Sequence, residues 1–194
     1  MLQYQKIMLQ TPGMALFDPA TLAHFLAGHG VEATDLLQHF IDFPALGDAA
    51  IAQGCLLPIY PIPVWDYTLA FNDGGDSATA PALVDAVLPA SLPLAITSGR
   101  LIVTDLLGLM DFDLAYYLQF PPAQERTGAD AEVELAPGNY AVQVLKFIGR
   151  ADPDVEQRQC GYEFLLRQVA VLPALAGLAI DALDYAIAAL ASPP

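Results

Sequence analysis

The sequence predicts an α+β fold that is mostly β: an antiparallel β-sandwich or bent sheet with flanking helices, a helical N-terminal third and an apolar C-terminal helix. Three observations predict it. Strand-forming stretches alternate with turn residues through the middle of the chain, helix-start residues gather in the first third, and 55% of the 194 residues are hydrophobic. At this length we expect residues 1–194 to form a single globular domain.

The first third predicts one strand followed by helices. Residues 4–9 are expected to form an edge strand. Asp18 followed by Pro19 is typical of a helix start, because the Asp side chain caps free N–H groups and Pro fits the first turn. Thr34 would cap a second helix, and residues 45–53 predict a third.

The middle of the chain predicts strands joined by turns, with one short helix at residues 82–88. A glycine turn would close a first hairpin and Pro-Gly-Asn a second. The expected strands are residues 64–71, 94–97 with 100–105, 114–120, 132–135 with 140–148, and 162–171.

Residues 174–190 follow Pro173 and are rich in Ala and Leu, which are strong helix formers. The predicted helix carries Asp181 and Asp184 on one stripe and is apolar on its other faces, so we expect it to be buried. It would pack on the protein's own sheet or form a homodimer contact with a second copy. Its apolar run is too short, and its aspartates too costly, for a membrane span.

The charge is strongly one-sided, with 22 acidic against 7 basic residues and a net charge of −15. Phosphate backbones repel such a chain, which argues against nucleic-acid binding through a basic surface. The acidity either keeps the protein soluble or matches a basic protein partner. The first residues lack the basic and apolar regions of a secretory signal, so a cytoplasmic location is expected.

No cofactor or metal is expected from the sequence motifs. Cys55 and Cys160 lie far apart without a second ligand nearby, which argues against a zinc site of ordinary spacing. They are expected to be reduced thiols, or else a disulfide if the protein is exported. Standard catalytic and nucleotide-binding motifs are absent from the sequence.

Acidic and aromatic side chains supply the candidate site residues. Asp105, Asp111 and Asp113 lie close in sequence and predict an acidic surface, or the carboxylates of a hydrolase. The candidate binding aromatics are Tyr60, Trp65, Tyr67, Tyr116 and Tyr117. Exposed Tyr and Trp side chains anchor interfaces at small entropic cost.

The two-residue period of a strand puts Trp65 and Tyr67 on one face. We therefore expect Trp65 in the core and Tyr60 partly exposed. If these aromatics instead surrounded a cleft with Tyr116 and Tyr117, they would form a small-molecule or carbohydrate site.

The layout of Ser98-Gly99, the strand that follows, Asp105 and the later segment 135–140 resembles small bacterial β-rich inhibitor or immunity modules, including the competence-associated nuclease inhibitors. The resemblance is confined to residues 98–140 and does not identify a family. Taken together, the sequence predicts a non-enzymatic protein-binding or regulatory module of a bacterial type. The alternatives are a small-molecule or carbohydrate-binding β-sandwich and a carboxylate-dependent hydrolase.

Overall fold

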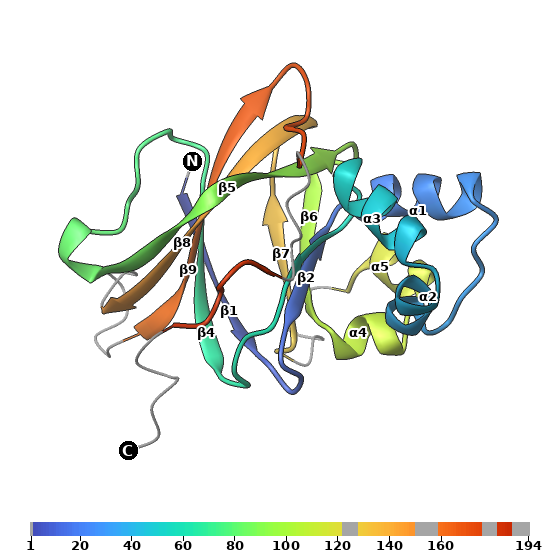
Figure 1. Ribbon diagram of the computed structural model, residues 1–194, viewed down its shortest axis with the longest axis horizontal. Coiled ribbons are helices and arrows are strands. Elements are labelled where there is room, and N and C mark those ends of the chain that lie inside the picture. Colours follow the sequence, from blue (N-terminus) through green and yellow to red (C-terminus); the bar gives the residue numbers. More distant parts are fainter. Residues whose placement is uncertain (1, 122–127, 150–158, 176–181, 188–194) are drawn as a thin grey trace.

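The computed structural model describes residues 2–121, 128–149, 159–175 and 182–187, and it contains two open β-sheets that pack face to face (Figure 1). In spatial order, the larger sheet consists of β1 (Leu2–Met8), β4 (Asp66–Asn72), β9 (Gln159–Val169), β8 (Gly138–Gly149) and β5 (Val84–Ile96). The smaller sheet consists of β3 (Leu57–Ile59), β2 (Met14–Phe17), β6 (Arg100–Asp105) and β7 (Asp130–Glu134).

Helices cover the outer face of the smaller sheet, on the right of Figure 1. They are α1 (Pro19–Gly28), α2 (Leu36–Asp42), α3 (Pro44–Ala52), α4 (Leu107–Met110) and α5 (Leu114–Gln119). A 3-10 turn, η1 (Pro81–Leu83), precedes β5. The molecule is therefore α+β with mostly strands, and the smaller sheet is its middle layer.

Strand β2 shows why the smaller sheet can lie in the middle. Met14 and Leu16 belong to the core between the sheets, whereas Ala15 and Phe17 pack with the helices. Successive side chains of a strand point to opposite faces. An unbroken apolar run is therefore what a strand covered on both faces requires.

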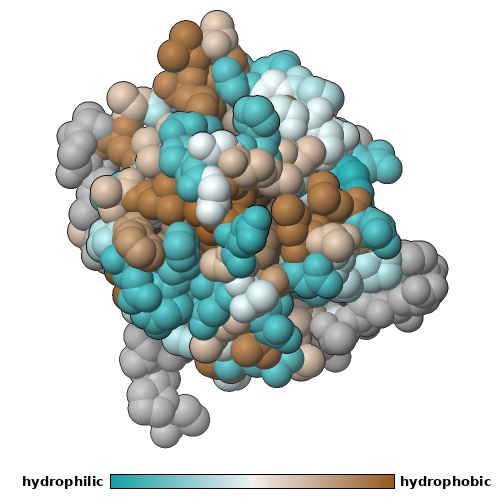
Figure 2. All heavy atoms as spheres, turned by 90° about the vertical axis from the view of Figure 1, so that its right-hand side faces the viewer, coloured by the Kyte–Doolittle hydropathy of each residue, from teal (hydrophilic) through white to brown (hydrophobic). Residues whose placement is uncertain are grey.

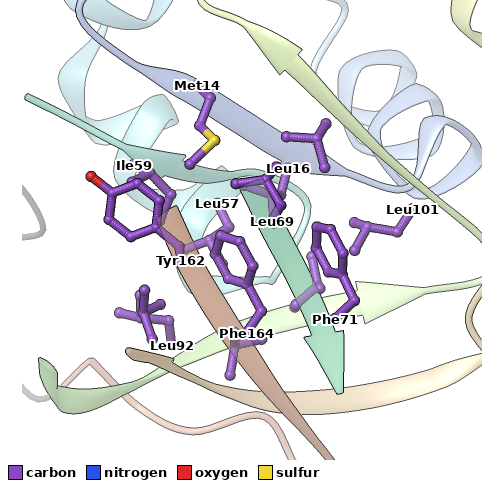
Figure 3. Close-up of a cluster of buried hydrophobic side chains, with 14 of the residues drawn as sticks. Met14, Leu16, Leu57, Ile59, Leu69, Phe71, Leu92, Leu101, Tyr162 and Phe164 are labelled. Atoms are coloured by element: carbon purple, nitrogen blue, oxygen red, sulfur yellow. The ribbon is translucent and has the colours of Figure 1, made fainter. Parts of the chain in front are cut away.

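Aliphatic side chains and aromatic rings fill the core between the sheets (Figure 3). Phe71 of β4 and Phe164 of β9 are register partners and stack with their centroids 5.0 Å apart. The ring centroids of Tyr162 and Tyr67 lie 5.4 Å apart, with the ring planes tilted by 48°. Such aromatic pairs stabilise a core beyond the area that they bury.

Hydrogen bonds join the two sheets along their edges. Gln3 Nε2 donates to the Glu134 carbonyl at 2.7 Å, and Gln5 Nε2 donates to the Glu132 carbonyl at 3.0 Å. On the opposite side, a backbone N–H of β5 donates to the Gly54 carbonyl at 2.9 Å. These contacts protect strand edges that would otherwise be available to another chain.

The predicted fold class is wrong in its arrangement. The larger sheet is not antiparallel throughout, because β4 and β9 are parallel neighbours. An apolar C-terminal helix is also not found: residues 174, 175 and 183–187 are not helical, and the rest of 174–190, apart from Ala182 in a 3-10 turn, lies outside the described residues. A homodimer contact through that helix therefore has no basis in the described segment.

Residues 183–187, here called the strap, cross the open side between the two sheets and complete the core (Figure 1). Leu183, Tyr185 and Ile187 are buried, while Asp184 between them is exposed. This alternation is that of an extended chain. Packing into the core therefore overrides the helix propensity of the Ala-rich sequence.

Both predicted hairpins are also wrong, because each turn leads from one sheet into the other. Ile96 pairs with Gly138 in the larger sheet, but Arg100 pairs with Glu134 in the smaller one. The turn after β7 likewise leads into β8 of the larger sheet. Turn residues show where the chain reverses, and they do not show which neighbour the next strand takes.

Two local predictions fail for other reasons. Residues 114–119 form helix α5 rather than a strand, because the Asp113 carboxylate accepts hydrogen bonds from the Ala115 and Tyr116 N–H groups and caps the helix. Most of the predicted helix at residues 82–88 belongs to β5. The helix start at Asp18 and Pro19 is confirmed, as are the strands at β1, β4 and β9.

Candidate functional site

The β1–β2 turn, the β3–β4 connection and α4 meet at the lower end of Figure 1, and each of them carries exposed apolar side chains. They are Met8, Tyr60, Val64, Trp65, Leu107 and Met110, each between 43% and 53% exposed, and we call this surface the apolar end. Backbone hydrogen bonds join its three segments: Leu9 N–H to Trp65 O at 3.1 Å, and Leu106 N–H to Gly13 O at 3.2 Å.

The β3–β4 connection holds its aromatic side chains on a rigid backbone. Prolines at positions 61 and 63 restrict the φ angle there. Tyr67 OH donates to the Pro63 carbonyl at 2.8 Å, and Ile62 N–H donates to the Pro12 carbonyl at 3.0 Å. Trp65 and Tyr60 are therefore presented with little backbone freedom left to lose on binding.

Asp105 fastens the β1–β2 turn to the start of α4. Its buried carboxylate accepts hydrogen bonds from the Gln10 and Thr11 N–H groups, the Thr11 hydroxyl and the Leu107 N–H. The structure thus places Asp105 beneath the apolar end rather than on an acidic surface. Its oxygens are occupied by donors of the protein itself, which does not suit a hydrolytic carboxylate.

Asp111 and Asp113 are exposed beside the apolar end. Asp111 directly follows Met110, and both carboxylates line a pocket of about 470 Å³ with Glu32 and apolar neighbours. Asp113 is also the cap of α5, so part of its capacity is structural. On the other side, exposed Asp66 directly follows Trp65. Acidic groups thus flank the apolar end.

The candidate aromatics divide between surface and interior. Tyr60 and Trp65 are both exposed in the β3–β4 connection, which confirms the expected exposure of Tyr60. The expectation that Trp65 is buried is wrong: Trp65 precedes the first residue of β4, so the alternation that buries Tyr67 does not extend to it. Because Trp65 contacts the Cys160 thiol, it is nevertheless supported from one side.

Tyr116 and Tyr117 belong to α5, not to a cleft with the surface aromatics. Tyr117 is buried in the cluster between the smaller sheet and the helices, where its ring lies 5.1 Å from Phe17. Its hydroxyl is 3.1 Å from the Thr104 hydroxyl, and burial raises its pKa. Tyr116 is half-buried and donates to Asp130.

Two further buried carboxylates, those of Glu163 and Asp18, hold loops in place. Glu163 of β9 accepts hydrogen bonds from Asn72, Ser77, Ala78 and Thr79, at 2.6–3.0 Å. Burial by itself raises the pKa of Glu163, but these donors outweigh it and the net pKa is lowered. A charged residue within an apolar strand was the signal available in the sequence.

The buried carboxylate of Asp18 likewise holds the corner between β5 and β6 in place. Besides capping α1 through Thr21, it accepts hydrogen bonds from the N–H groups of Thr97 and Ser98 and from the Ser98 hydroxyl. Burial raises the pKa of Asp18, and these hydrogen bonds bring the net value below its ordinary 3.8.

A second pocket, of about 430 Å³, brings His24 and Cys55 to one place at the edge of the helical layer. Burial raises the pKa of the Cys55 thiol to about 11, so the reactive thiolate is disfavoured at neutral pH. Both cysteines are free thiols. Within the described ranges, the structure brings no three His, Cys, Asp or Glu side chains close enough to hold a metal ion.

The outer face formed by the helices also carries exposed apolar side chains and serves as a comparison with the apolar end. Figure 2 shows brown apolar areas on this face that hydrophilic residues interrupt. Ile41 and Phe43, at the junction of α2 and α3, are 59% and 56% exposed. They provide a comparison surface of similar exposure without Trp or Tyr. Among the described helices, none is long and apolar enough to cross a membrane.

No protein-family model matches this sequence, and no curated protein matches it. Two solved structures are similar in shape. The crystal structure of ComJ, inhibitor of the DNA degrading activity of NucA, from Bacillus subtilis, has a TM-score of 0.45 and 9% identity, covering 87% of this chain and 99% of that chain. Crocagin biosynthetic gene J has a TM-score of 0.44 and 14% identity, covering 85% and 97%. Neither similarity assigns a function to this chain.

Proposed function

We propose that this protein is a non-enzymatic binding module that docks on a cationic protein through the apolar end and regulates or inhibits it. The observation that carries the proposal is the pair Trp65 and Tyr60, 53% and 45% exposed on a restrained backbone. Tyr and Trp side chains dominate the energetics of protein interfaces when they enter pockets of a partner.

The surrounding charge supports a basic partner. Asp66 and Asp111 lie next to Trp65 and Met110 at the border of the apolar end. The chain as a whole carries a net charge of −15. An apolar centre with an acidic border is complementary to an apolar patch with a basic border, and such a pair associates faster at low salt.

The other function classes have less support from the geometry. Tyr116 and Tyr117 are engaged within α5 and its neighbours, so they do not extend a small-molecule site at Trp65. Asp105 is occupied by the loop that it holds. We also propose, on the sequence alone, that residues 1–194 act as one domain and that the protein works in the cytoplasm.

Affinity capture tests the proposal with three full-length proteins: wild type, Trp65→Ala and the control Ile41→Ala. Ile41 is apolar and 59% exposed, against 53% for Trp65, but it lies on α2. We expect a cationic protein to be captured by wild type and Ile41→Ala, and to bind Trp65→Ala at least about tenfold more weakly. Its release should increase as salt is raised.

Equal capture by wild type and Trp65→Ala would contradict the apolar end as the docking surface. Recovery of no cationic protein at low salt would contradict the partner class. Where a cationic protein is captured, calorimetry with that purified protein measures its affinity for each variant.

A further inference from the structure

The strap is bound by side chains that recognise its backbone. Lys146 Nζ donates to the carbonyl oxygens of Asp184 and Ala186, at 3.1 and 2.6 Å. Tyr162 OH donates to the carbonyl between them, that of Tyr185, at 2.8 Å. Three consecutive carbonyl groups are thus recognised by β8 and β9, and every peptide offers these groups whatever its sequence.

The strap side chains define what the groove accepts. Leu183, Tyr185 and Ile187 are 7%, 0% and 0% exposed within the core between the sheets. The Asp184 side chain is 80% exposed and lies 3.4 Å from Lys146 Nζ. The groove therefore takes apolar side chains at every second position and leaves the position between them facing solvent.

The central position does not fit tyrosine fully. The Tyr185 hydroxyl is buried without a hydrogen-bond partner among the residues that the structure describes. A buried hydroxyl without a partner loses its hydration and gains nothing in return. Phenylalanine would occupy the same space without that loss.

We propose that the space between β8, β9 and the smaller sheet is a peptide-binding groove, which the strap occupies in cis. Its ligand in trans is an extended segment of another protein with apolar residues at alternate positions and Phe at the centre. Backbone recognition supplies affinity, and the alternating apolar positions supply selectivity, as in other modes of extended-peptide binding. This proposal does not depend on the function proposed for the apolar end.

Because the strap belongs to the same chain, its effective concentration at the groove is on the order of millimolar, and a free peptide must compete with it. Variants that weaken or strengthen the strap should therefore change peptide binding in opposite directions. Full-length Ile187→Asp places a charge in the core and weakens the strap. Full-length Tyr185→Phe removes the unpaired hydroxyl and strengthens it.

The test uses two fluorescent peptides, one with residues 183–187 and one with Phe in place of Tyr185, and measures anisotropy. We expect the Phe peptide to bind roughly tenfold more tightly than the Tyr peptide. For either peptide, affinity should decrease from Ile187→Asp through wild type to Tyr185→Phe. Lys146→Met in the Ile187→Asp background should weaken binding, whereas Ile41→Ala on α2 should leave it unchanged.

Circular dichroism establishes which variants are folded. If Ile187→Asp is unfolded, the comparison of wild type with Tyr185→Phe decides alone. Absence of Phe-peptide binding to every folded form overturns the proposal. Equal affinity for wild type and Tyr185→Phe also overturns it, because a strap that occupies the same groove must compete.

Discussion

Two groups of acidic side chains differ in their surroundings, although their chemistry is the same. Asp18, Asp105 and Glu163 are buried and accept hydrogen bonds from loops that they hold in place. Asp66 and Asp111 are exposed beside the apolar end. A net charge counts both groups equally, but only the exposed group is accessible to a partner, whereas the buried group stabilises the fold.

Hydrogen-bond donors from nearby loops offset the cost of burying the carboxylates of Asp18, Asp105 and Glu163. Removing a carboxylate from water is costly unless hydrogen bonds to the charged form replace its hydration. Glu163 receives four such bonds, three of them from the turn at residues 77–79. Each buried acid therefore fixes one loop, and its removal should affect that loop far more than the surface charge.

Glu163→Gln should have the largest effect on stability. Both oxygens of Glu163 accept hydrogen bonds, so the amide group of Gln must face a donor on one side. We expect the free energy of unfolding to fall by about 2–3 kcal/mol. Urea denaturation monitored by circular dichroism measures the difference.

Asp66→Asn is the matched control, because it also removes one negative charge, but from an exposed position. It should change the free energy of unfolding by less than about 0.5 kcal/mol. Similar losses for both variants would show that buried and exposed acids are not distinct in the way the hydrogen bonds indicate.

The pH dependence of stability should separate the same two groups. The pKa values of Glu163 and Asp18 are lowered below their ordinary values of 4.5 and 3.8. Depressed values stabilise the fold above the ordinary pKa, and that stabilisation is lost as pH falls through the folded-state pKa.

Stability should therefore begin to fall below about pH 4.5 and continue to fall toward pH 3. Urea midpoints at a series of pH values measure this loss. The loss should be smaller in Glu163→Gln, which has no carboxyl group to protonate there. A wild-type stability that stays constant down to pH 3 would contradict lowered pKa values at both sites.

The difference between local and non-local signals explains which features could be predicted from the sequence. The role of Asp18 as a helix cap depends on Thr21, three residues away, and was predictable. The role of Glu163 depends on residues 72–79, which reach it only because β4 and β9 are parallel neighbours. No pattern near Glu163 in the sequence indicates these partners.

The strap shows the same limit in another form. Its Ala- and Leu-rich sequence favours a helix, yet Leu183, Tyr185 and Ile187 also alternate as an extended segment does. The gap between the two sheets decides between these patterns, and that gap exists only in the folded molecule. The exposure of Tyr60 was predictable because the prolines around it exclude a central strand, whereas Trp65 depended on where β4 begins.

Substitution of the exposed acids should have the smallest effect on stability, and it should still have a measurable effect on binding. Asp66→Asn combined with Asp111→Asn removes two charges beside the apolar end without touching a loop-holding carboxylate. The free energy of unfolding should stay within about 0.5 kcal/mol of wild type. The rate constant for association with the cationic partner should be severalfold below the wild-type value at low salt. At high salt it should approach the wild-type value, because salt screens the same electrostatic attraction that the substitutions remove. Stopped-flow measurements at two salt concentrations check this, and a rate constant that is the same for both proteins at low salt would exclude the acidic border from recognition.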